Sequence, residues 1–206
     1  MVRLFYQVFA ALALVSGSAA KIECITENDY FGGKGGTLFE DKVNRETNTT
    51  GIVLRSAERL DAIGIIVGDA EMKLNGGVGG KKETIDLKGK RIIAMEVHRA
   101  GNGEDKRIVF VKFDVKDGRS FQAGSEDNGR TQENIMKFEA PVEGAYLIGF
   151  VGRANNEVDA LGGIWLDSEC AERLKKDDSS VSINQVDFSN AKFGVSNDDD
   201  DDDAGS

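Results

Sequence analysis

The stretch Gly149–Asp167 reads GFVGRANNEVDALGGIWLD and decides the fold that we predict for this chain. Its first residues are apolar and partly β-branched, which predicts a strand, and the apolar run resumes at Leu161. Between them lies a polar segment whose paired Asn155 and Asn156 suit a tight turn, because asparagine tolerates positive φ. Asp159 stands at the foot of this loop. We expect its carboxylate to face outward with unused acceptors, a geometry suited to neighbouring hydroxyls on a ligand.

The composition favours a single all-β domain with extensions. The chain has 206 residues, of which 25 are glycine and one is proline. Many glycines with almost no proline fit tight turns between paired strands. The formal net charge is −10, which excludes nucleic acid and anionic membrane surfaces as partners on electrostatic grounds.

Residues 1–20 are predicted to be a signal peptide. They combine a positive Arg3, a short apolar stretch over Phe9–Val15 and small residues at Ser18–Ala20. The apolar stretch is too short to span a bilayer, and no second one is long enough for membrane insertion. We therefore expect a secreted protein with a mature domain over residues 21–172.

Residues 173–206 are predicted to be a disordered acidic tail. They hold few large apolar side chains and include six consecutive aspartates, Asp198 to Asp203. Such a run can attract Ca²⁺ loosely, but it is not a dedicated calcium site, because it lacks an ordered loop with a turning glycine.

The two cysteines, Cys24 and Cys170, predict a disulfide. They flank the domain, and an even pair in an oxidising compartment indicates a bridge. It would close a loop long enough to contribute roughly 5 kcal/mol by the chain-entropy estimate. The alternative is a pair of free buried thiols. Two cysteines and a single histidine, His98, do not supply a zinc site, so we expect no metal and no cofactor. His98 lies in a strand pattern and is interpreted as structural.

Short strands recur between the cysteines, separated by turn signals such as Gly101-Asn102-Gly103 and Asp117-Gly118. The clearest is 107–115, where valine and phenylalanine alternate with Lys112 and Asp114. Other strands are expected at 51–54, 60–67, 91–98, 135–138 and 145–151. This spacing favours a β-sandwich, barrel or prism.

Two motifs occur twice. GGKGG at 32–36 returns as GGVGG at 76–80, and VDALG at 158–162 returns as LDAIG at 60–64. A glycine-rich turn lets backbone N–H groups approach a ligand, and an aspartate at a loop foot supplies an acceptor. The two copies indicate internal pseudo-symmetry. The alternative is that the glycine clusters only make hairpin turns.

Together and in this order, FGGKGG at 31–36, FED at 39–41, IGFVGR at 148–153 and VDALG at 158–162 resemble the jacalin-related lectins. The resemblance covers roughly 25–167. It implies the β-prism I fold, with three four-stranded Greek-key sheets around a pseudo-threefold axis and with first and last strands close together. The repeated glycine turn resembles banana-type members, which carry two sugar sites. We expect a mannose or glucose preference, because nothing predicts the chain cleavage that accompanies galactose preference in jacalin.

The resemblance also assigns roles to residues of this sequence. Gly36 would donate its backbone N–H to a sugar hydroxyl, and Asp159 would accept from two adjacent hydroxyls in charge-assisted bonds. The N–H groups of Asn156 and Glu157 would complete the donors, and Asn155 takes the loop position that is usually glycine. The turn containing Asp117, Gly118 and Arg119 matches the family's recognition loop. A second, weaker site would be formed by Gly80 and Asp61.

The sequence thus predicts a secreted carbohydrate-binding module without catalysis, whose partners are glycans or glycoproteins, with avidity from a homo-oligomer or the second repeat. The alternative is a matrix or mineral-associated structural protein with a degenerate sugar site and a cation-attracting aspartate tail. A glycosidase is disfavoured because Glu157 and Asp159 share one loop, whereas catalytic carboxylates flank the scissile bond. Asn48 begins the sequon Asn48-Thr49-Thr50, which predicts a surface glycosylation site.

Overall fold

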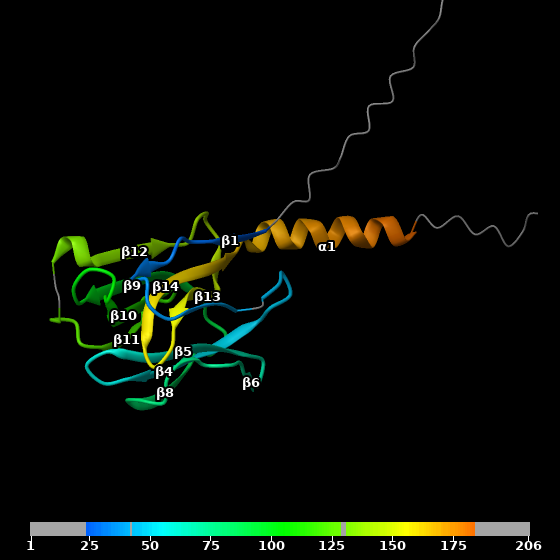
Figure 1. The fold of residues 1–206 in the computed structure, drawn as a ribbon. Coiled ribbons are helices and arrows are strands. Elements are labelled where there is room, and N and C mark those ends of the chain that lie inside the picture. The colour runs from blue at the N-terminus through cyan, green and yellow to red at the C-terminus, as the bar shows by residue number, and fades with distance from the viewer. Residues whose placement is uncertain (1–23, 42, 129–130, 184–206) are drawn as a thin grey trace, which may run out of the picture.

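The computed structural model describes residues 24–41, 43–128 and 131–183. The predicted signal peptide and the aspartate run 198–203 lie outside these residues. The described chain forms three antiparallel sheets and one α-helix, so the prediction of an all-β domain is confirmed (Figure 1). No helix among the described residues is long and apolar enough to cross a membrane.

Each sheet has four strands in a continuous hydrogen-bonded path, and two of the sheets carry one further short strand. The first sheet contains β1 (Ile25–Glu27), β14 (Val158–Leu166), β13 (Tyr146–Ala154) and β3 (Thr37–Glu40), with β2 (Phe31–Gly32) beside β14. The second contains β6 (Ala70–Glu71), β5 (Leu60–Val67), β4 (Thr49–Ser56) and β8 (Lys81–Asp86), with β7 (Asn75–Gly76) beside β5. The third contains β11 (Ser120–Gly124), β10 (Arg107–Val115), β9 (Ile92–Ala100) and β12 (Ile135–Glu139), which follows the 3₁₀ turn η1 (Gln132–Asn134).

A long central hairpin forms the middle of every sheet: β4 with β5, β9 with β10, and β13 with β14. The inward faces of these hairpins build one shared core, which includes the fully buried Ile63, Phe113, Phe150 and Trp165. The ring of Phe113 from the third sheet lies 5.9 Å from the ring of Phe150 in the first. Three sheets that share one core match the pseudo-threefold prism expected from the sequence.

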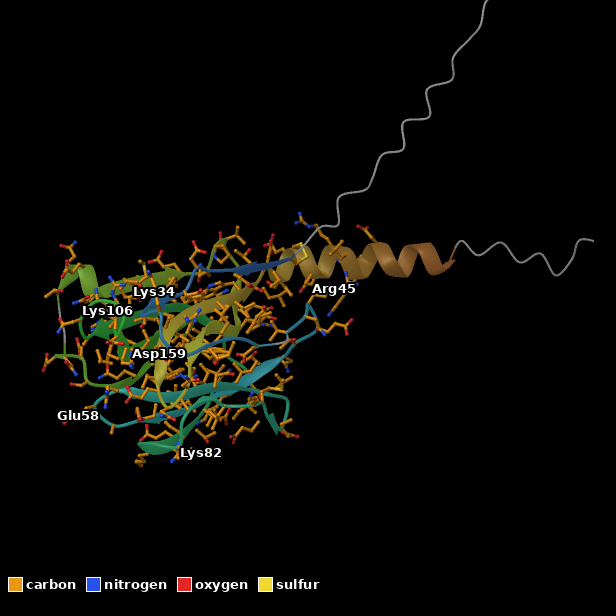
Figure 2. All side chains as sticks on the ribbon, viewed as in Figure 1. Lys34, Arg45, Glu58, Lys82, Lys106 and Asp159 are labelled. Atoms are coloured by element: carbon orange, nitrogen blue, oxygen red, sulfur yellow. A yellow bond between two sulfur atoms is a disulfide. The ribbon has the colours of Figure 1, made fainter. Side chains whose placement is uncertain are left out.

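The Cys24–Cys170 disulfide is present, and the alternative of two free thiols is wrong. β1 pairs with the end of β14, with Ile25 opposite Leu166, so the two ends of the domain meet and the cysteine Cα atoms lie 5.5 Å apart. The bridge joins residues 146 positions apart in the sequence. It lies at the N-terminal end of the α-helix (Figure 2).

The helix α1 spans Ser168–Ile183 and corrects the expectation that disorder begins at residue 173. The Asp167 carboxylate accepts the Cys170 N–H at 3.1 Å, which satisfies one of the first free N–H groups of the helix. Cys170 and Ala171 are buried, and Leu174 packs against the same small apolar cluster. The helix has no glycine or proline, so capping and local propensity support it despite few apolar residues.

Candidate carbohydrate site

The first glycine turn and the loop between β13 and β14 meet at the end of the prism away from α1, where Figure 2 places Lys34, Lys106 and Asp159. The pairing of β2 and β3 with the central hairpin positions the turn, because Gly32 lies opposite Ala160 and Thr37 lies opposite Ala154. The Gly33 N–H donates to the Asp159 carbonyl at 2.8 Å. The structure therefore brings Gly36 and Asp159 together, as the sequence predicted.

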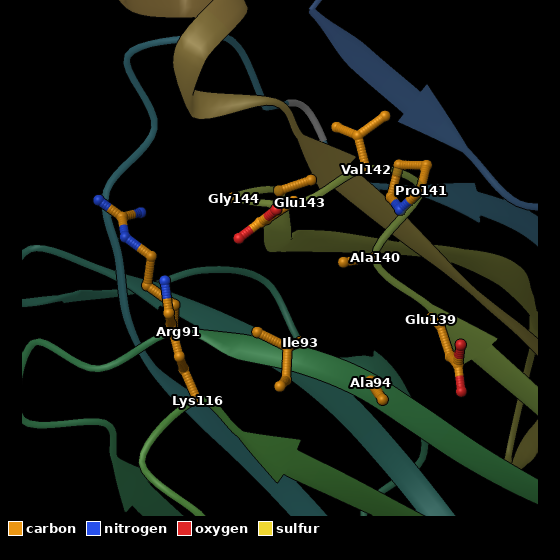
Figure 3. A pocket seen from close by; sticks show the side chains of 11 residues that line it. Arg91, Ile93, Ala94, Lys116, Glu139, Ala140, Pro141, Val142, Glu143 and Gly144 are labelled. Carbon is orange, nitrogen blue, oxygen red and sulfur yellow. The ribbon is translucent and has the colours of Figure 1, made fainter.

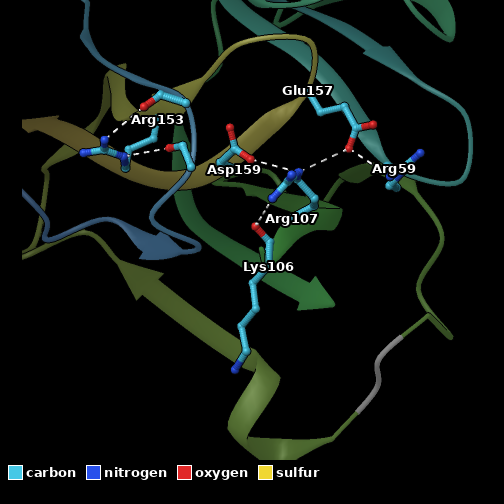
Figure 4. A network of polar contacts seen from close by, with 8 residues as sticks. Arg59, Lys106, Arg107, Arg153, Glu157 and Asp159 are labelled. Carbon is cyan, nitrogen blue, oxygen red and sulfur yellow. Dashed lines mark hydrogen bonds and ion pairs between the residues drawn. The ribbon is translucent and has the colours of Figure 1, made fainter. Parts of the chain in front are cut away.

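The contact between turn and carboxylate requires glycine. Gly36 has φ +66°, and a Cβ there would collide with Oδ2 of Asp159 and lie 2.8 Å from the Ala154 nitrogen. Arg153 holds the turn from behind by donating Nε to the Gly35 carbonyl at 2.7 Å and Nη2 to the Gly36 carbonyl at 2.9 Å (Figure 4). We call this constellation of Gly35, Gly36 and Asp159 the Asp159 site.

The Asp159 carboxylate is neither outward-facing nor free, which corrects the expectation from sequence. Asp159 is 4% exposed, and its Oδ1 lies 2.9 Å from Nε of Arg107, which reaches it from β10 of the third sheet (Figure 4). Burial raises the pKa of Asp159, and the nearby Glu157 adds to that rise, whereas Arg107 and Arg153 oppose it. No local motif marks Arg107, so sequence reasoning missed it.

Arg107 belongs to a charged cluster with Arg59 and Glu157. Oε2 of Glu157 lies 3.0 Å from Nη1 of Arg59 and 3.7 Å from Nε of Arg107. This oxygen is buried and has no hydrogen bond of good geometry, so its contacts with both arginines are ionic. Each of the three residues comes from the central hairpin of a different sheet: Arg59 from the β4–β5 loop, Glu157 from the β13–β14 loop and Arg107 from the start of β10 (Figure 4).

The second glycine turn repeats the geometry of the first. A Cβ on Gly80, which has φ +59°, would lie 2.5 Å from Oδ2 of Asp61, and one on Gly79 would lie 2.5 Å from Oδ1. The Gly77 N–H donates to the Asp61 carbonyl at 2.9 Å. Arg55 donates to the Gly79 carbonyl at 2.8 Å, as Arg153 does to the first turn. We call Gly79, Gly80 and Asp61 the Asp61 site.

A third copy of the backbone arrangement has no carboxylate. Gly124 has φ +88°, and the Ser125 N–H donates to the Val109 carbonyl at 2.8 Å, as Gly33 and Gly77 do in the other repeats. Val109 stands where the other repeats have aspartate, and it is buried. The residues that the structure describes therefore form two candidate sites of this kind. The sequence did not reveal this copy, because it lacks the double glycine and the aspartate.

The loops that precede the two aspartates have closely matching turns. The Asn155 N–H bonds the Glu157 carbonyl, and the Ala57 N–H bonds the Arg59 carbonyl, both at 3.1 Å. Lys88 is the one non-glycine residue with positive φ in the described chain. Neither Asn155 nor Ala57 thus needs a left-handed conformation, so neither loop requires glycine at this position.

The turn with Asp117, Gly118 and Arg119 does not join either site, which corrects its assignment as a recognition loop. β10 begins at Arg107 beside Asp159 and runs nine residues to Val115, so the turn that follows lies roughly 26 Å away at the other end. There Arg119 donates to the Leu87 carbonyl at 3.3 Å.

A groove of about 540 Å³ also opens at that far end, next to the loop before β13 (Figure 3). Its walls carry two cations, Arg91 and Lys116, and two carboxylates, Glu139 and Glu143. It is separated from the glycine turns by the length of β9, which begins beside it at Ile92.

His98 is buried, with Nε2 2.7 Å from Glu96, and it contacts the Phe110 ring, which is a structural environment. The Trp165 indole N–H donates to Asn28 at 2.6 Å inside the core. Asn48 is exposed immediately before β4, where a sequon is accessible.

Comparison with known proteins agrees with this geometry. The profile of the jacalin-like lectin domain matches residues 28–164. A secreted RxLR effector protein 19 from Plasmopara viticola is 25% identical over 173 residues, covering 79% of this chain and 93% of that protein.

Solved structures share the fold. A mannose-binding jacalin-related lectin from Ananas comosus superimposes with a TM-score of 0.58 at 24% identity, covering 70% of this chain and 99% of that one. Malaysian banana lectin gives a TM-score of 0.57 at 21% identity, with 69% and 98% covered. Artocarpin in complex with methyl-α-mannose gives 0.59 at 17% identity, with 70% and 99% covered.

Proposed function

This chain belongs to the jacalin-like lectin family, whose members bind carbohydrate and are non-catalytic, and we propose that it is a secreted lectin for mannose- or glucose-type glycans. The observation that carries the proposal is the duplicated pairing of a glycine turn with a carboxylate. In both copies an arginine donates to the turn carbonyls, and the last glycine of the turn lies directly against the aspartate carboxylate.

At each site the aspartate accepts hydrogen bonds from adjacent pyranose hydroxyls, and the last glycine of the turn, Gly36 or Gly80, donates its backbone N–H. At the Asp159 site the backbone N–H groups of Asn156 and Glu157 add donors. Charge-assisted bonds to a carboxylate are stronger than neutral ones, so loss of a carboxylate should cost about 1.5–3 kcal/mol at its site, one to two decades of affinity. No step of this recognition requires a metal.

A sugar is a small polar ligand that buries little area, so single-site affinity is expected to be weak, and useful avidity comes from two sites on one prism or from a homo-oligomer. Secretion fits the disulfide, since such bridges persist in oxidising compartments, and it fits the similarity to a secreted effector.

The alternative of a structural protein with a degenerate site draws on one observation, the ion pair between Arg107 and Asp159. The carboxylate of Asp61, which has no partner among the described residues, favours a working lectin. A glycan array decides between them. The mature protein should bind mannose- and glucose-terminated glycans above galactose-terminated ones, and the Asp61→Ala/Asp159→Ala variant should lose that signal. Absence of any glycan binding by the wild type refutes the proposal.

A further inference from the structure

The two sites share a backbone but differ in the state of their carboxylates, and this difference has a consequence if the proposed function holds. At the Asp159 site one carboxylate oxygen already has a cationic partner at 2.9 Å. At the Asp61 site, among the described residues, the carboxylate has neither a hydrogen bond nor an ion pair. A neutral sugar therefore meets an occupied acceptor at one site and a free acceptor at the other.

We propose that Arg107 is a specificity-determining residue that competes with sugar hydroxyls for Asp159, so that neutral sugars bind first at the Asp61 site. A hexose that donates two adjacent hydroxyls to one carboxylate needs both oxygens. Oδ2 of Asp159 lies against Gly36, and Oδ1 is held by Arg107. The sugar gains a full pair of bonds at this site only when Arg107 releases Oδ1.

Glu157 is an alternative partner for the Arg107 guanidinium when it leaves Asp159. Its Nε lies 3.7 Å from Oε2 of Glu157, an oxygen that lacks a hydrogen bond of good geometry. Arg107 can therefore leave Asp159 and keep an anionic partner. The Arg107 side chain is 31% exposed, so a change of rotamer does not require the core to open.

Arg107 holds this role because of where the third repeat lies. Gly33 of the first turn packs on the loop that leads into Arg107, since a Cβ there would collide with the Lys106 carbonyl, next to Arg107 in the chain. Gly77 of the second turn packs in the same way on the loop that contains Asn156 and Glu157. The position that carries arginine beside Asp159 thus corresponds to glutamate beside the second turn. Glutamate cannot pair with Asp61, and it turns to Arg59 instead.

The surroundings of the Asp61 site also suit a neutral ligand. Val78 at the tip of its turn is 91% exposed, because its carbonyl is held by Arg55 and its side chain points away from the domain. The corresponding residue of the first turn is Lys34, which is paired with Glu104 at 2.7 Å. One rim therefore offers an apolar contact to a sugar face or aglycone, whereas the other carries an exposed ion pair.

The test uses the full mature chain and titrates methyl α-mannoside at pH 7.5. The Asp61→Ala variant isolates the Asp159 site, and Arg107→Ser is then added to it. Arg59→Ser in the same background is the matched control, because it removes one positive charge from the same cluster without touching Asp159. Thermal melting verifies that each variant is folded.

Arg107→Ser should strengthen binding at the isolated Asp159 site by about three- to thirtyfold, the range between an exposed ion pair and a buried charged hydrogen bond. Arg59→Ser should leave it within twofold, and Asp61→Ala should weaken wild-type binding more than Asp159→Ala does. A gain in affinity cannot arise from damage to the fold.

Weaker or unchanged binding on Arg107→Ser overturns the inference, as does an equal gain on Arg59→Ser. So does a larger loss on Asp159→Ala than on Asp61→Ala, and in each of these cases the lectin function stands. If neither the wild type nor any variant binds a mannoside or any other glycan, the proposed function fails together with the inference.

Discussion

Replacing Gly80 by alanine should destabilise the domain and disable the Asp61 site, and Gly68 offers a control with the same backbone strain. Gly80 has φ +59° and Gly68 has φ +60°, so the left-handed backbone strains an alanine equally at both positions. A Cβ at Gly68 meets nothing within 4 Å. A Cβ at Gly80 would lie 2.5 Å from Asp61 Oδ2 and 2.6 Å from the Ser56 carbonyl oxygen. The Ser56 contact is with backbone, so no rotamer relieves it.

The left-handed conformation of an alanine lowers the free energy of unfolding by about 1–2 kcal/mol. Alanine also reduces the conformational entropy of the unfolded chain, which raises the free energy of unfolding by about 0.4–1 kcal/mol. Gly68→Ala should therefore lower the free energy of unfolding by about 1 kcal/mol. Gly80→Ala adds crowding worth about 1–3 kcal/mol, for a total of about 2–4 kcal/mol. Because the turn must move away from Asp61, mannoside affinity should fall at least tenfold, whereas Gly68→Ala should leave it unchanged.

Urea unfolding followed by the fluorescence of Trp165, the single and fully buried tryptophan, measures the first quantity, and mannoside titration measures the second. Equal unfolding free energies for the two variants would refute the crowding argument. Equal sugar affinities would show that the second turn does not contribute to binding.

Three further predictions concern stability and the tail. Burial raises the pKa of Asp41 to about 6, above 3.8 in the unfolded chain. Its stabilising contribution is therefore complete below pH 3.8 and is lost as pH rises through 6. The free energy of unfolding of the wild type relative to Asp41→Asn, measured in urea, should fall by about 2–3 kcal/mol between pH 3.5 and pH 7.5, and a pH-independent difference contradicts this. Replacing Cys24 and Cys170 by alanine should lower the free energy of unfolding by up to about 5 kcal/mol, with an unchanged melting temperature as the contrary result. Deleting 197–206 should leave mannoside affinity unchanged but abolish loose Ca²⁺ association by equilibrium dialysis; a large loss of sugar affinity would show that the tail reaches the sites.

The sequence predicted those parts of the fold that carry a local signal. β10 alternates apolar and polar residues over its second half, and it was expected at its observed bounds. β8 was missed, because Lys81–Asp86 is an exposed strand with almost no apolar residue and is ordered by pairing with β4. The helical start of the tail was missed because its support comes from the Asp167 cap and the disulfide rather than from an apolar face.

The site residues that belong to local sequence motifs were predicted, and those that reach the site only through tertiary contacts were missed. Gly36 and Asp159 were visible as motifs, and the structure brings them together. Arg107 was invisible, because its role depends on the third sheet lying beside the first glycine turn. The misplaced turn at Asp117 had a local match to a family motif, but the direction of β10 decides which end of the prism it occupies.

The most direct test of the account is calorimetric titration of methyl α-mannoside into the mature wild type and into the Asp61→Ala/Asp159→Ala variant. Both carboxylates lie against glycine turns, and the third repeat has Val109 in that position, so the described part of the chain contains no other site of this design. We predict weak, measurable binding to the wild type and none to a folded double variant. Undiminished binding to the double variant, or no binding to the wild type, would contradict it.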